Sequence, residues 1–63
     1  MIKITTRLSF RHAEIELTKA IDKNEPDKFE LYLLNRTLSE HVIVSLSADE
    51  LVQLRMLLCN VGL

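Results

Sequence analysis

The chain has few of the residues that usually stabilise a small protein or build a catalytic site. Its 63 residues include one cysteine, one glycine, one proline, one tyrosine and no tryptophan. The single cysteine excludes a disulfide within the chain, and the two histidines have no cysteine cluster near them, so the usual zinc spacings are absent. One glycine excludes a glycine-rich phosphate loop. No run of about 18 apolar residues occurs, so no membrane-spanning helix is predicted.

The overall composition is that of one small globular domain spanning residues 1–63. Hydrophobic residues make up 48% and charged residues 27%, with a net charge of −1, which argues against disorder. A core this small contributes only about 3–5 kcal/mol, and small domains compensate with disulfides, a metal or a partner chain. The sequence therefore predicts a homo-oligomer, most simply a dimer. The lone cysteine and the lack of a signal peptide predict a cytoplasmic location.

The C-terminal segment carries the clearest secondary-structure signals. Residues 47–50, SADE, have the spacing of a capping box, in which serine and glutamate side chains satisfy each other's backbone amides. The only glycine, Gly62, stands where a left-handed residue ends a helix, with Leu63 placed to contact Leu58. These signals predict a helix over 48–61.

Two strands are predicted before this helix. In KFELYLLNR, Phe29, Leu31 and Leu33 fall on one face, and in HVIVSLS the residues Val42, Val44 and Leu46 alternate with Ile43 and Ser45, which is typical of strands. Pairing Leu33 with Val42, and Leu31 with Val44, places both apolar sets on one face and leaves RTLS as the connection. DKNEPD, rich in turn-forming residues, is predicted to be a loop.

The segment RLSFRHAEIELTKAI admits two interpretations. Apolar residues occupy even positions from Ile2 to Phe10 and odd positions from Ala13 to Leu17. A hairpin that turns at residues 9–12 produces this change of parity and brings both sets to one face. The expected register places residue 8 opposite 13 and residue 4 opposite 17.

In this hairpin Arg7 faces Glu14 on the other side of the sheet. The resulting fold class is α+β, a four-stranded antiparallel meander packed by one C-terminal helix (ββββα). The alternative is βαββα, with residues 10–23 helical, because alanine, glutamate, leucine and lysine are good helix formers. A hairpin leaves one sheet face without cover and implies a partner, whereas a helix makes a monomer plausible.

Surplus apolar surface is the main functional signal. One helix cannot cover both faces of a sheet, and a soluble monomer rarely exposes large apolar patches. The predicted helix already has one apolar stripe for the sheet, and a second stripe lies on another side. The residues predicted to form protein interfaces are Tyr32, Leu34 and Ile43 on the sheet, and Val52, Met56 and Cys59 on the helix. Which set serves self-association and which binds another protein is left open.

The alternative function is binding of single- or double-stranded nucleic acid. Lys3, Arg7 and Arg11 would project from one face of the first strand and could follow a phosphate backbone, with Tyr32 able to stack a base. The ending VIVSLSADELVQLRMLL resembles the strand-into-helix end of the whirly family of single-strand binders, whose subunits share the ββββα layout. This resemblance implies a shared topology and transfers no binding residue.

No catalytic, cofactor-binding or metal-binding residues are predicted. Ser39, Glu40 and His41 are adjacent in a connection and cannot align as a catalytic relay, and His12 is better explained as a turn residue. The sequence therefore predicts a non-enzymatic regulatory protein of the inhibitor or adaptor type. Its size suits an accessory protein of a bacterium or phage.

Overall fold

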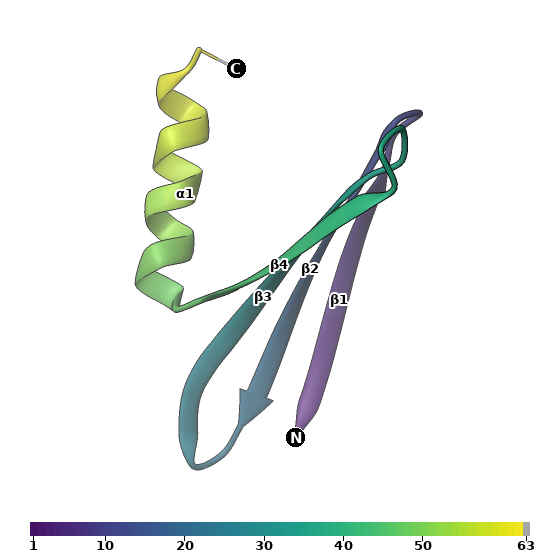
Figure 1. Ribbon diagram of the computed structural model, residues 1–63. Helices are drawn as coiled ribbons and strands as arrows, with labels where there is room; N and C mark the ends of the chain where they lie inside the picture. The colour runs from purple at the N-terminus through teal and green to yellow at the C-terminus, as the bar shows by residue number, and fades with distance from the viewer. Residues whose placement is uncertain (63) are drawn as a thin grey trace.

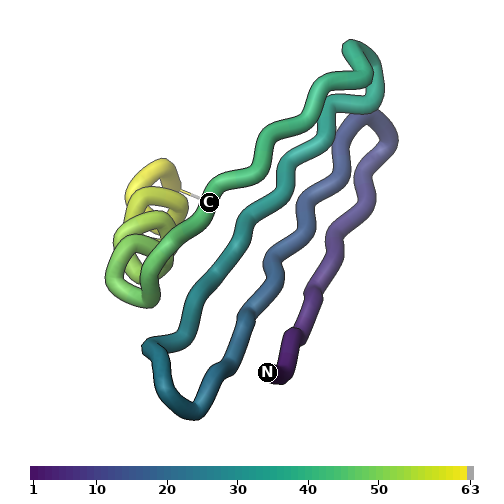
Figure 2. The backbone as a smooth tube through the Cα atoms, turned by 60° about the horizontal axis from the view of Figure 1, so that its bottom comes forward, coloured from purple at the N-terminus to yellow at the C-terminus, as the bar shows by residue number. Residues whose placement is uncertain are grey.

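The computed structural model describes residues 1–62, which form one antiparallel sheet followed by one helix (Figure 1). The strands lie side by side in the order β1-β2-β3-β4, as a meander (Figure 2). The elements are β1 (Ile2–Ser9), β2 (Ala13–Asp22), β3 (Glu25–Asn35), β4 (Glu40–Leu46) and α1 (Ala48–Asn60). This arrangement confirms the predicted ββββα fold.

The helical alternative for residues 10–23 is wrong, because residues 13–22 form strand β2. Strand β2 pairs with β1 on one side and with β3 on the other, and these contacts override the local preference for helix. The observed register pairs Leu8 with Ile15 and Ile4 with Lys19, two residues away from the predicted register. A shift of two keeps every side chain on its predicted face.

The first turn lies closer to the second strand than predicted. The Phe10 amide donates to the Ala13 carbonyl at 2.8 Å, which leaves Arg11 and His12 at the tip of the hairpin. Neither tip residue has a positive φ, so the turn does not belong to the glycine-requiring types that dominate two-residue hairpins. This explains how a turn without Gly, Asn or Asp can close the hairpin.

The segment DKNEPD is mostly strand, which corrects its prediction as a loop. Asp22 pairs with Glu25 across a turn of only two residues, and the pairing shifts register between Ala20 and Asp22. The Asp22 carboxylate accepts a hydrogen bond from the Asn24 amide at 3.1 Å, as in an Asx turn. Pro26 lies next to the strand end, where a missing amide donor is tolerated.

The β3–β4 hairpin has the predicted register, with Leu33 opposite Val42 and Leu31 opposite Val44. Its connection is closed by Asn35, whose Oδ1 accepts from the amides of Thr37 at 3.1 Å and Leu38 at 3.2 Å. Asparagine favours such turns because its side chain replaces a backbone acceptor.

Both ends of helix α1 agree with the sequence signals. The Glu50 amide donates to Ser47 Oγ at 3.2 Å, and the Ser47 amide donates to Glu50 Oε1 at 3.0 Å, which completes the capping box. Gly62 follows the helix with a φ of 82°, the left-handed conformation that glycine adopts without strain. The predicted contact of Leu63 with Leu58 lies outside the described residues.

The capping box gives a first testable prediction. Ser47→Ala removes the hydroxyl acceptor of the Glu50 amide and should lower the free energy of unfolding by about 1 kcal/mol. Denaturant unfolding followed by helical circular dichroism measures this change. Ser45→Ala, which removes a hydroxyl from strand β4 without removing a cap, is the matched control and should change stability little. Equal loss in both variants would show that the box does not hold the helix start.

The same box makes helix stability depend on pH. Hydrogen bonds from the Ser47 amide and hydroxyl hold the pKa of Glu50 below its ordinary value. A lowered folded-state pKa stabilises the fold above the unfolded carboxyl pKa, and this contribution is lost as the pH falls through the folded value. The pH dependence in this acidic range should therefore be weaker in Ser47→Ala than in the unmodified chain.

Helix α1 covers only part of the sheet. The sheet and the helix meet at Ser47 and diverge from there, so that they enclose an open V (Figure 1). No Cα atom of β1 or β2 lies within 8 Å of one in the helix, which approaches β3 and β4 alone. Among residues 1–62 no side chain is fully buried, so a single copy of the chain has no closed core.

Candidate protein-interaction site

The sheet face that points toward the helix is mainly apolar, with Thr6 and Lys19 as its polar residues on β1 and β2. The register places β1 and β2 residues of this face in cross-strand pairs, such as Leu8 with Ile15 and Ile2 with Ile21, and Leu17 continues the row to Leu31 of β3. We call the β1 and β2 part of this surface the open face. It comprises Ile2, Ile4, Leu8, Ile15, Leu17 and Ile21.

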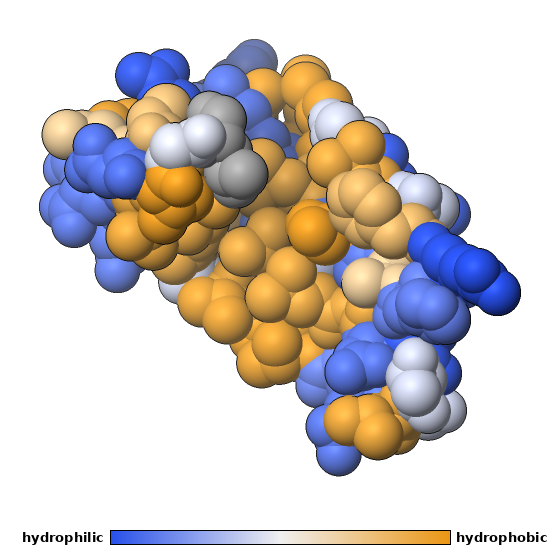
Figure 3. Space-filling view, turned by 90° about the horizontal axis from the view of Figure 1, so that it is seen from above, coloured by the Kyte–Doolittle hydropathy of each residue, from blue (hydrophilic) through white to orange (hydrophobic). Residues whose placement is uncertain are grey.

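The open face is exposed to solvent in a single copy of the chain. On β1, Ile2 and Leu8 have 62% and 58% of their surface exposed, and on β2 the corresponding residues are only half-buried. Apolar side chains form a continuous surface from the helix across the sheet (Figure 3). Exposed apolar patches of this kind mark interaction sites in soluble proteins.

The V between helix and sheet is a groove of about 530 Å³. Its sheet wall includes Leu8, Leu17 and Leu31, and its helix wall includes Leu54 and Leu58. Leu58 is nevertheless 51% exposed, because the helix and the sheet diverge toward the C-terminal end of the helix (Figure 1). The groove is therefore a cleft with mainly apolar walls, to which Thr6 adds a hydroxyl on the sheet side and Arg55 a guanidinium on the helix side.

The last two turns of helix α1 are apolar on several sides. We call Met56, Leu57, Leu58 and Val61 the helix end; each has more than half of its surface exposed. Only Arg55 and Asn60 interrupt this segment with polar side chains. A helix that is apolar nearly all round is normally buried, so the helix end also lacks a cover.

The predicted sheet contact lies on the opposite face from the helix, as its register implied. Tyr32 and Ile43 are cross-strand partners, and Leu34 pairs with His41. The Tyr32 and His41 rings lie 5.8 Å apart. Tyr32 and Leu34 are half-buried and only Ile43 is exposed, so this patch is smaller than the open face. Its role as an interface stays a prediction.

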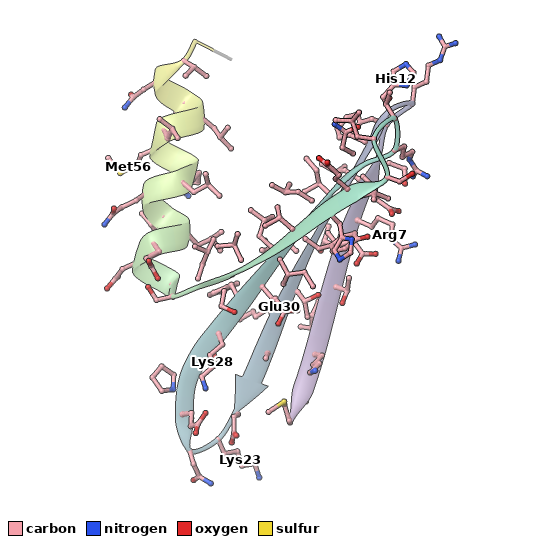
Figure 4. All side chains as sticks on the ribbon, viewed as in Figure 1. Arg7, His12, Lys23, Lys28, Glu30 and Met56 are labelled. Carbon is pink, nitrogen blue, oxygen red and sulfur yellow. The ribbon has the colours of Figure 1, made fainter. Side chains whose placement is uncertain are left out.

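The predicted helix contact reaches the edge of the groove at one end. Val52 lines the groove between helix and sheet, whereas Met56 projects away from the sheet (Figure 4). Cys59 is exposed. The three residues share one side of the helix, as their spacing implies, and Val52 lies where this side meets the groove. Their role as an interface stays a prediction.

The basic residues predicted as nucleic-acid contacts do not form a continuous cationic surface. Arg7 forms ion pairs with Glu16 and, at 3.3 Å, with Glu14, and it projects from the side of the sheet opposite the helix (Figure 4). Glu16 lies between Arg7 and Tyr32 in the register. A phosphate backbone passing from β1 to this ring would meet a carboxylate, which opposes binding of an anion.

The remaining basic positions do not restore a continuous strip. Lys3 lies on the same face of β1 as Arg7, because the two positions differ by an even number of residues. Arg11 lies at the hairpin tip, outside the strand. Arg36 also approaches Glu14, at 3.8 Å, so the acidic and basic side chains of this face compensate one another.

The polar residues considered for catalysis are separated by the fold. His12 occupies the first hairpin turn and lies 3.5 Å from the Thr37 hydroxyl. Glu40 and His41 are consecutive in β4 and point to opposite faces of the sheet. Within residues 1–62, no three metal-ligating side chains lie together, and no helix is both long and apolar enough to span a membrane.

The open face is the surface that the sequence interpretation missed, since the helix stripe was expected to cover the whole sheet. Four strands about 4.8 Å apart span roughly 15 Å between the outer two, beyond which their side chains extend further. One helix is about 10 Å wide and cannot cover that width. The predicted number of strands and helices therefore already indicated that part of the sheet face would stay uncovered.

Comparisons with protein-family models, with curated proteins and with solved structures found no match to this chain.

Proposed function

We propose that this chain is a non-enzymatic binding protein that acts through protein–protein contacts as a homodimer, in the manner of an inhibitor or adaptor. The observation that supports this proposal is the absence of any fully buried side chain among residues 1–62, together with an apolar sheet face that the chain's own helix leaves uncovered. Isolated small domains need such surface to be buried before they become stable.

Protein binding accounts for the surface better than nucleic-acid binding does. The largest uncovered surface is apolar, whereas phosphate backbones are bound through free cationic side chains. Arg7, the middle one of the three basic residues predicted to contact nucleic acid, forms ion pairs with two carboxylates. The smaller patch at Tyr32 and Ile43 lies on the opposite side of the sheet from the groove, and a homodimer could present it to a further protein.

Sedimentation equilibrium on the unmodified chain tests this proposal. We expect a mass of two chains of 7.3 kDa each at micromolar concentration, with dissociation only at much greater dilution. A mass of one chain over the whole accessible concentration range, in a folded sample, would contradict the proposed homodimer.

A further inference from the structure

We propose that the open face of each chain is covered by helix α1 of a second copy, in a symmetric dimer in which the helix end of each chain enters the groove of its partner. This inference rests on the proposed homodimer and adds which surfaces meet. It is carried by three observations: the amount of surplus surface, the complementary positions of groove and helix end, and the location of the surplus on a face of the sheet.

The surplus surface has the size of a dimer interface. The chain exposes 5410 Å², whereas a compact chain of its mass exposes about 4,200 Å². The surplus of about 1,200 Å² per chain exceeds the roughly 800 Å² that each partner buries in a standard interface and falls in the range of obligate homodimers. The radius of gyration, 13.2 Å, likewise exceeds the value of about 11 Å expected for a compact chain of this length.

The groove and the helix end complement each other, and within one chain Leu58 is the helix-end residue that lines the groove. Leu57 and Val61 are 59% and 61% exposed, and the helix does not approach β1 or β2. A second copy supplies the missing element at equal stoichiometry, since it carries the same helix end and the same open face. In a two-fold symmetric dimer, both contacts between a helix end and an open face form at once, as in an isologous interface.

Edge-to-edge pairing of β1 strands is the competing way to join two copies. Strand β1 is exposed along its whole length, and unpaired edges can join two sheets. Such pairing would satisfy backbone groups but leave Ile4, Leu8 and the helix end in water. Helix docking removes the apolar surface itself, which is the larger stabilising contribution.

A matched pair of charge substitutions in the helix tests the proposed contact. Leu58→Glu places a carboxylate on the helix wall of the groove, and we expect dimerisation to weaken by at least about a hundredfold, because each dimer carries the change twice. Gln53→Glu adds the same charge on the polar side of the helix and should leave the dimer unchanged. Sedimentation equilibrium measures both, and a dimer that survives Leu58→Glu would overturn the helix-in-groove arrangement.

A second measurement avoids any damage to the fold by Leu58→Glu. One set of chains, without ¹⁵N, carries a nitroxide on Asn60→Cys in a Cys59→Ser background. These chains are mixed with ¹⁵N-labelled Cys59→Ser chains that carry no nitroxide. Broadening of the ¹⁵N signals then arises only between copies, and we expect it at the amides of Ile4, Leu8 and Ile15.

The outcomes separate this inference from the proposed function. Broadening at these three amides supports helix docking. A dimer without broadening there, including one joined at the β1 edges or through the Tyr32 patch, overturns the inference and leaves the proposed homodimer standing. A folded monomer that remains monomeric, as would result if a different protein covers the groove, overturns both.

Discussion

Leu17→Lys is expected to leave the chain largely unfolded. Leu17 stands in the middle of β2, between Thr6 on β1 and Leu31 on β3, and it lines the groove. In the proposed dimer, which covers this face, its replacement removes about 2 kcal/mol of apolar burial and brings an ammonium group into apolar surroundings, which costs more. A chain of this length has a total stability of about 3–9 kcal/mol, so the loss consumes most of it.

Thr18→Lys is the matched control for this substitution. It adds the same charge one position along the same strand, on the opposite face of the sheet, where Thr18 pairs with Glu30. Opposite charges on cross-strand neighbours are favourable by a few tenths of a kcal/mol, which offsets the loss of the hydrogen bond between Thr18 and Thr5. Circular dichroism and denaturant unfolding should show a folded Thr18→Lys protein. Two variants with equal stability would contradict the assignment of the apolar face.

The fold was predictable from the sequence because its signals are local and periodic. The parity change between Phe10 and Ala13 predicted that two strands share one apolar face, and the capping box at Ser47 fixed the helix start. The exact β1–β2 register was not predictable, because a shift of two residues preserves every face. The turn residues Arg11 and His12 carry no signal strong enough to choose between the two registers.

The candidate site was only partly predictable. The pairing of Tyr32 with Ile43 followed from the alternation in β3 and β4, but the orientation of the helix did not. The angle at which α1 leaves Ser47 decides whether Leu57, Leu58 and Val61 cover the sheet or stay in water, and no pattern in the sequence encodes that angle.

Thermal unfolding at several concentrations of the unmodified chain tests most directly whether folding and dimerisation are one event. If the apolar face is closed by a second copy, dilution favours the unfolded chains by mass action. We expect the unfolding midpoint to rise by about 5 °C for each tenfold increase in concentration, given the unfolding entropy of two such chains. A midpoint that stays constant over a hundredfold range of concentration, with a fully folded sample at the lowest concentration, would contradict the account, because the chain would then be stable with its open face uncovered.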